Sequence, residues 1–116
     1  MDRDFEPGDE PVKLCLRAGA IVDFHKKVQG SFDLMGESVG FFRFDERASR
    51  RLAAIVEDHV ASSRAHLPHE EAVRDLLLER SQSFEVCDVT GAPWIEIDFP
   101  ADVARAAREV LPQLET

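Results

Sequence analysis

Two acidic residues near the C-terminus, Glu96 and Asp98, are the residues best suited to chemistry in this chain. The alternation over residues 94–99 predicts a strand on which both carboxylates share a face with Trp94. Pro100 suits the first turn of a following helix, so Asp98 leaves the strand where that helix begins. Carboxylates at such strand ends often bind ligands in open α/β sheets, and Mg²⁺ is commonly held by one or two of them. The alternative is a solvated edge strand whose acids face water.

Other polar residues offer possible contacts to a substrate. Lys13 lies in the first strand of a predicted hairpin, and Lys26 and Lys27 close that hairpin. These lysines either form a solvated face or bring one ammonium group to a phosphate. Glu37 precedes an apolar run and is either a loop carboxylate in water or a substrate contact.

The histidines and cysteines do not suggest a metal centre. His59 falls on the apolar face of a predicted helix, which favours a packed histidine, and His66 and His69 flank Pro68 without sharing a regular face. The two cysteines, Cys15 and Cys87, lie in apolar runs, which predicts two buried thiols in a cytoplasmic protein rather than a disulfide framework.

Length and composition indicate a single domain over residues 1–116. The chain is 44% hydrophobic and 32% charged, which is enough apolar material for a core. Its net charge of −9 argues against nucleic-acid or anionic-membrane binding, and no apolar run reaches the roughly 18 residues that a membrane helix needs. Residues 1–11 are acidic and rich in turn residues, which predicts a loop and not a signal peptide.

The patterns along the chain predict an α/β fold. In order, they indicate a β-hairpin (12–17 and 20–25), a packed flap (28–38), a buried central strand (38–44), two helices, a second hairpin (84–89 and 94–98) and a last helix from Pro100 to about Leu111 that packs on the sheet. Asp45 is the expected N-cap of the first helix, and Pro68 begins the second. The expected apolar faces are Leu52, Ile55, Val56, His59, Val60 and Ser63, then Val73, Leu76, Leu77 and Arg80, and finally Val103, Ala106, Ala107 and Val110.

Two motifs carry a family resemblance. Residues 36–44, Gly-Glu-Ser-Val-Gly-Phe-Phe-Arg-Phe, and residues 94–100, Trp-Ile-Glu-Ile-Asp-Phe-Pro, resemble the NTP-transferase family. The branch that looks most similar is that of the phosphocholine and phosphonate cytidylyltransferases, within the sugar-nucleotidyltransferase superfamily. Residues 69–72, His-Glu-Glu-Ala, resemble a Tyr-Glu-Asp-Ala segment, and residues 8–13 also look familiar. The resemblance covers nearly the whole chain in family order.

The resemblance implies a partial Rossmann-like nucleotidyltransferase sandwich. The implied reaction joins a nucleoside monophosphate, such as CMP from CTP, to a phosphorylated small molecule such as phosphocholine or a phosphonate. It implies that Mg²⁺ binds Asp98, with Glu96 beside it. The implied acceptor pocket contains Glu37, Trp94 and the 69–71 segment with His69 and Glu70, while Lys13, Lys26 or Lys27 contacts phosphate. An aromatic face with carboxylates suits a choline-like cation.

The chain also departs from that family. His69 and Glu71 replace the Tyr and Asp of the family segment, and the glycine-rich nucleotide loop and an earlier metal aspartate are missing. The sequence therefore resembles the C-terminal part of such an enzyme, inactive until the missing half is supplied, either by a separate polypeptide or by upstream coding sequence lost to a misplaced start. The alternative is a non-catalytic α+β module that associates with a partner chain, or with itself as a homo-oligomer, through an exposed sheet edge. A complete enzyme using Glu96, Asp98 and His69 has no motif to support it.

Overall fold

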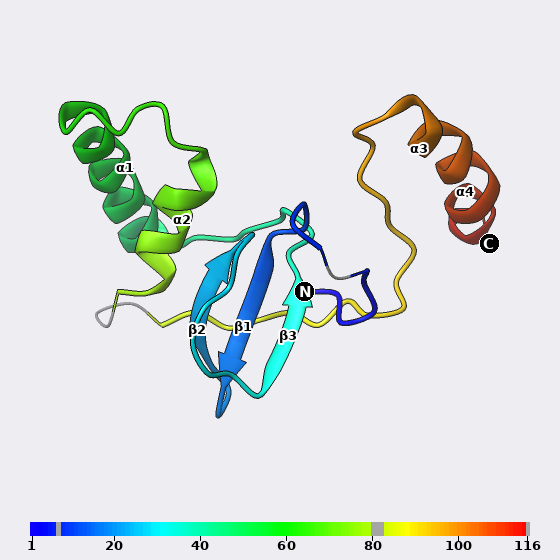
Figure 1. The fold of residues 1–116 in the computed structure, drawn as a ribbon, viewed down its shortest axis with the longest axis horizontal. Coiled ribbons are helices and arrows are strands. Elements are labelled where there is room, and N and C mark those ends of the chain that lie inside the picture. Colours follow the sequence, from blue (N-terminus) through cyan, green and yellow to red (C-terminus); the bar gives the residue numbers. More distant parts are fainter. Residues whose placement is uncertain (7, 80–82, 116) are drawn as a thin grey trace.

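The computed structural model describes residues 1–6, 8–79 and 83–115, which form a mixed α/β structure (Figure 1). An antiparallel sheet has the order β2-β1-β3, from β1 (Lys13–Arg17), β2 (Ala20–His25) and β3 (Leu34–Glu37). The helices α1 (Glu46–Ala61) and α2 (His69–Leu77) lie together beside β2. A separate helical run comprises α3 (Pro100–Arg105), the π-helical η1 (Ala106–Val110) and α4 (Leu111–Leu114). Within the described residues, no helix has the length and apolar character needed to cross a membrane.

The first predicted hairpin is confirmed as β1 and β2. Its two-residue turn consists of Ala18 and Gly19, with φ angles of 50° and 81°. Two consecutive positive φ values are typical of the hairpin turns whose twist matches that of the flanking strands. A register shift between Cys15 and Leu16 marks an irregularity in the pairing.

The third strand lies earlier in the chain than predicted. The central strand expected over 38–44 is wrong, because that segment has no strand, and β3 instead comes from the predicted flap. Gly36 faces Met1 so closely that an added Cβ would lie 2.2 Å from the Met1 Cγ, so a glycine is required there. Beyond β3, Gly40 takes a φ of 77° and Phe41 is 89% exposed, so the chain leaves the sheet at this point.

Both central helices are confirmed, with one error in their faces. The Asp45 carboxylate accepts a hydrogen bond from the Ala48 N–H at 2.7 Å and caps α1. His59 is buried, as predicted, and its Nε2 lies 2.8 Å from Asp75 Oδ2. Val56 and Val60, expected on the buried face, are 45% and 61% exposed, because among the described helices and strands α1 contacts only α2. Ser63, expected on the same face, lies beyond the end of the helix and is exposed.

Helix α2 covers the core with its apolar stripe. Val73, Leu76 and Leu77 are buried as predicted, whereas the expected stripe residue Arg80 lies outside the described residues. One core cluster lies between α2 and the sheet, and a second lies between α1 and α2. The first contains Met1, Leu14, Leu16, Phe24, Val73 and Leu77, and the second contains Ile55, Ala72 and Leu76.

The second predicted hairpin is wrong. Neither 84–89 nor 94–98 carries a strand, although the turn between them forms, with Gly91 at a φ of 84° and Ala92 N–H donating to Val89 O. Residues 84–89 instead run across the strands (Figure 1). There the Met1 amino group donates to Cys87 O at 2.6 Å and Val89 N–H donates to Met1 O at 2.8 Å. The N-terminal residue therefore takes the backbone contacts that the hairpin partner was expected to make.

The C-terminal helix does not pack on the sheet, so that prediction is also wrong. The helical run extends to Leu114, and within the described chain its elements contact only one another (Figure 1). Asp102 caps it by accepting the N–H groups of Phe99 and Asp98, at 2.8 and 3.1 Å. Phe99, which precedes Pro100, is extended with φ −127° and ψ 155°, as proline requires of its predecessor.

The predictions of fold class and of buried cysteines are each confirmed in part. A mixed α/β class is confirmed, whereas a Rossmann-like sandwich remains a prediction, since the described sheet is antiparallel. Cys15 is buried and free, but Cys87 is exposed, so the expectation of two buried thiols is wrong for Cys87.

Candidate functional site

A row of polar residues crosses one end of the sheet and contains two of the predicted site residues, Lys13 and Glu37. Lys13 on β1 is opposite both His25 on β2 and Glu37 on β3, and Glu37 also forms an antiparallel bridge with Asp2. Directly opposed residues in antiparallel pairs point to the same face, so these four side chains share one face of the sheet. With strands about 4.8 Å apart, His25 and Glu37 are separated by roughly 10 Å.

The carboxylate of Glu37 in this row lies near other negative charges. Partial burial raises the pKa of Glu37, the negative charges of Glu96 and Asp2 raise it further, and Lys13 acts in the opposite direction. The sequence-predicted residues Glu37 and Glu96 are therefore close enough to repel each other. A site in which carboxylates repel is one that a bound cation would stabilise.

Asp2 is the residue of this site that sequence reasoning missed. It is 8% exposed, and its carboxylate accepts the Trp94 Nε1–H at 2.8 Å and the Asp4 N–H at 2.9 Å. This contact links Trp94 to Asp2, the residue whose backbone pairs with Glu37. An aspartate in an acidic, turn-rich stretch carries no periodicity, so the sequence offered no signal for it.

Lys13 is buried and already has acceptors for all of its ammonium protons. Its Nζ donates to the carbonyl oxygens of Gly8, Pro11 and Lys26, and the contact to Pro11 measures 3.2 Å. An ammonium group has three donors, so a phosphate would have to displace one of these carbonyls. Of the other two lysines, Lys26 pairs with Glu10 at 3.6 Å.

The predicted acceptor segment at the start of α2 lies at the same end of the sheet. Glu71 Oε1 is 2.7 Å from the Nε2 of His25, the β2 member of the row. His69 itself is 83% exposed, and its Nδ1 lies 3.4 Å from the carboxylate of its neighbour Glu70. The structure thus brings Glu71 to the row, while His69 and Glu70 form a pair of their own at the helix N-terminus.

A buried ion pair fixes α2 in this position. Arg74 Nε donates to Asp23 Oδ1 at 2.8 Å, and Asp23 is 5% exposed. Burial works to raise the pKa of Asp23, but the hydrogen bonds from Arg74 and from the Phe24 N–H outweigh it and hold that pKa below its ordinary value. Asp23 therefore stays ionised and keeps α2 docked on β2.

The two predicted metal ligands lie on the arm that follows Trp94. Glu96 is exposed but acts electrostatically on Glu37, whereas Asp98 is exposed and lines neither described pocket. No group of three acidic, histidine or cysteine side chains within residues 1–6, 8–79 and 83–115 has a spacing that would hold a metal. The oxygen donors Glu37, Glu96 and Asp98 nevertheless fit a hard cation in chemical type, so Mg²⁺ stays a prediction.

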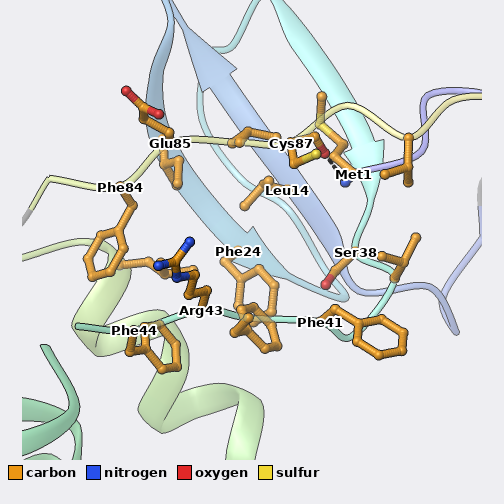
Figure 2. A pocket seen from close by; sticks show the side chains of 16 residues that line it. Met1, Leu14, Phe24, Ser38, Phe41, Arg43, Phe44, Phe84, Glu85 and Cys87 are labelled. Carbon is orange, nitrogen blue, oxygen red and sulfur yellow. Dashed lines mark hydrogen bonds between the residues drawn. The ribbon is translucent and has the colours of Figure 1, made fainter. Parts of the chain in front are cut away.

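An apolar pocket occupies the opposite face of the sheet. It has a volume of about 410 Å³ and lies between residues 38–44, residues 84–89 and the side chains of Leu14 and Phe24 (Figure 2). Phe24, Phe42, Phe44 and Phe84 form a chain of ring contacts with centroid distances of 5.8–6.1 Å. Arg43 points into the space between Phe84 and Phe24, as Figure 2 shows. No sequence-predicted site residue lines this pocket.

Comparison with known proteins does not indicate a function for the polar row or for the apolar pocket. No family model, no curated protein and no solved structure matches the chain. Function must therefore be argued from the side chains themselves.

Proposed function

We propose that this chain provides the acceptor-binding part of a nucleotidyltransferase, with the acidic row around Glu37 and Trp94 binding a phosphorylated cation of the phosphocholine class. The observation that carries the proposal is the partly buried Glu37 carboxylate, whose pKa is raised by burial and by the neighbouring Glu96 and Asp2. One of these acidic residues, Asp2, also accepts the indole N–H of Trp94, the single tryptophan of the chain.

The chemistry of the row suits a quaternary ammonium group. Such a cation is attracted to the face of an indole ring and to nearby carboxylates, and it needs no hydrogen-bond acceptor. Binding it would offset the repulsion among Glu37, Glu96 and Asp2. The phosphate end of the ligand would lie toward a lysine, and Lys26, whose Glu10 partner is 92% exposed, is more easily recruited than Lys13.

The transfer step needs more than this row. In the proposed reaction, a phosphate oxygen of the acceptor attacks the α-phosphorus of CTP and pyrophosphate leaves. Bound Mg²⁺ would supply charge neutralisation on the phosphates, with Asp98 and Glu96 as its protein ligands. The chain resembles the C-terminal part of the family, and residues 1–116 contain no glycine-rich nucleotide loop. We therefore propose that the nucleotide site lies outside these residues and that they are inactive alone.

Intrinsic fluorescence tests the binding step directly. Trp94 is the only tryptophan and the chain has no tyrosine, so every change in indole emission arises at the proposed site. Titration with phosphocholine should give a saturable change with a Kd below roughly 1 mM. Choline should give the same change more weakly, and phosphoethanol, which lacks the cation, should give none. Glu37→Gln and Glu96→Gln should each weaken binding about tenfold, by removing one charge from the cation's surroundings.

The matched control is Glu57→Gln, which removes one charge from an exposed position of α1 outside the row. It should bind like the wild type. Equal weakening by Glu57→Gln, or no saturable response of the wild type to phosphocholine, would refute the proposal. Pyrophosphate release from CTP, Mg²⁺ and phosphocholine by the purified chain alone would refute the part that calls the chain incomplete.

A second candidate is a non-catalytic module that binds a partner chain, and exposed apolar surface favours it. Both edges of the sheet are partly covered, which disfavours pairing with a strand of a partner chain. The β2 edge lies against α2, and β3 pairs at Glu37 with Asp2. Large apolar side chains are exposed elsewhere, among them Phe41, Phe99 and Leu114 at 89%, 68% and 61%. A partner chain is therefore expected to bind through these side chains rather than through a strand edge.

A further inference from the structure

The chain exposes far more surface than a compact monomer of its mass. Its accessible surface is 8354 Å², whereas a folded monomer of 13.0 kDa is expected to expose about 6,300 Å². The radius of gyration is 15.9 Å, compared with about 13 Å for a compact chain of this length. The excess of roughly 2,000 Å² per chain is in the range that obligate dimers bury.

Two unpartnered apolar surfaces contribute to the exposed area. One is the C-terminal helix, residues 100–114, which is about 22 Å long and touches no other helix or strand within the described chain. Val103, Leu111 and Leu114 on it are 56%, 48% and 61% exposed. The other is the apolar pocket of about 410 Å³ beside Phe41 and Phe84 (Figure 2). Native interiors hold few voids larger than a water molecule, so a pocket of this size is open for an occupant.

The arm that carries the helix favours an occupant from another molecule. Residues 95–99 contain the β-branched Ile95 and Ile97 and end in Phe99, which Pro100 keeps extended. No glycine follows Gly91, so the arm has no residue suited to a sharp reversal. Trp94 fixes the start of the arm through Asp2, and Figure 1 shows the helix carried beyond β3, away from α1 and α2.

We propose that two copies of this chain form a dimer by exchanging their C-terminal helices, each helix 100–114 docking in the apolar pocket of the other copy. Reciprocal exchange of an identical helix gives a closed assembly with two-fold symmetry, in which the same helix–pocket contact forms twice. It buries Val103, Leu111 and Leu114 together with the exposed phenylalanines of the pocket.

The charges around both surfaces are compatible with this docking. Arg43 and Glu85 line the pocket, and neither forms a salt bridge within the part of the chain that the structure describes. The helix presents both signs, with Arg105 and Glu109 on the side away from Val103. Because Arg105 and Glu109 lie away from the Val103 stripe, they can stay in water when that stripe docks, and the pocket itself carries one charge of each sign.

Light scattering coupled to size-exclusion chromatography tests the dimer with the full chain. The wild type should have twice the chain mass of 13.0 kDa at about 10 µM. Val103→Glu on the helix and Phe41→Ser on the pocket should each raise the dissociation constant at least about tenfold. Both side chains are largely exposed in one copy, at 56% and 89%, so neither change should unfold the body.

Two further variants separate exchange from other kinds of association. Ala101→Glu adds the same charge two residues before Val103, about 200° around the helix, and should leave the dimer intact. Inserting Gly-Gly-Ser-Gly between Ile97 and Asp98 should let the helix fold back and convert the dimer to a monomer with unchanged circular dichroism. A monomeric wild type, equal dissociation by Ala101→Glu, or a dimer that survives the glycine insertion would each overturn the proposal.

The dimer and the ligand site are tested independently. Val103→Glu should leave the phosphocholine response of Trp94 unchanged, and Glu37→Gln should leave the dimer mass unchanged. Failure of one proposal therefore does not imply failure of the other.

Discussion

Replacing Arg74 by methionine should remove the positive charge that pairs α2 with Asp23 on β2. The change keeps most of the aliphatic stem but removes the guanidinium group that donates to Asp23 at 2.8 Å. Asp23 is 5% exposed and would keep only backbone donors, among them the N–H of Phe24 at 2.8 Å. A nearly buried carboxylate would thus lose its countercharge.

The expected cost follows from the degree of burial. Removing one partner of a fully buried ion pair costs about 3–5 kcal/mol. The Arg74 side chain is 34% exposed and Asp23 retains backbone hydrogen bonds, so water and those donors offset part of the loss. We therefore expect Arg74→Met to lower the free energy of unfolding by about 2 kcal/mol at pH 7. Asp23→Asn should cost about 1 kcal/mol, because the amide oxygen can still accept the same hydrogen bonds.

The double variant and the pH dependence make this prediction specific. Asp23→Asn/Arg74→Met leaves no buried unpaired charge, so it should cost less than the sum of the single changes, with a coupling of about 1 kcal/mol or more. Asp23 has a lowered pKa in the folded state, so its contribution is fully present above the ordinary value of 3.8 and is lost as the pH falls through the folded value. The cost of Arg74→Met should shrink over the same acidic range.

Urea unfolding followed by far-UV circular dichroism measures all four proteins of this cycle. Purely additive costs at pH 7 would refute the reasoning, because they would mean that Asp23 and Arg74 do not interact. A cost of Arg74→Met that is unchanged well below pH 3.8 would refute the assignment of the effect to the Asp23 charge.

Three further predictions follow from single side chains. Glu37→Gln should raise the free energy of unfolding at pH 7, because the raised pKa of Glu37 marks a penalty on its charged form, and urea titrations should show the difference disappearing below pH 4.5. Asp45→Ala should lower the free energy of unfolding by about 1 kcal/mol, through loss of the cap on Ala48 N–H, whereas Asp45→Asn should cost little in the same urea titration. Cys87, which is exposed, should react with a thiol reagent in the folded protein, while Cys15, whose thiol pKa is raised first by burial and then by Asp23, should react only on unfolding.

Local signals were sufficient to predict the elements whose residues interact with near neighbours. The first hairpin follows from its alternation and from Ala18-Gly19, and α1 follows from the Asp45 cap and its periodicity. His59 was correctly placed in the core because its apolar neighbours recur at helical spacing. In each case, the stabilising contact lies within a few residues or on a regular face.

Elements that depend on distant partners were predicted less well. Residues 38–44 have the composition of a buried strand. However, a strand can pair along only two edges, and β1 already pairs with β2 on one edge and with Leu34–Glu37 on the other. Residues 84–89 find their backbone partner in Met1, which no local pattern indicated. Of the candidate site, the electrostatic interaction between Glu37 and Glu96 and the contact of Asp2 with Trp94 join distant parts of the chain, and no local pattern indicated either of them.

Trp94 links the two proposals, because it is both the aromatic wall of the ligand site and the fixed start of the arm. Its hydrogen bond to Asp2, the bridge partner of Glu37, fixes the ring at the point where residues 95–99 leave the body. Asp2→Ala should therefore change the results of both assays. It should weaken the fluorescence response to phosphocholine, and it should raise the dimer dissociation constant because residues 95–99 would be less restrained. Asp2→Asn keeps an acceptor for the indole N–H and should restore the dimer, but it removes a charge from the row and should not restore cation binding. If the two variants behaved alike in both assays, the direction of the arm would not depend on Trp94 at all.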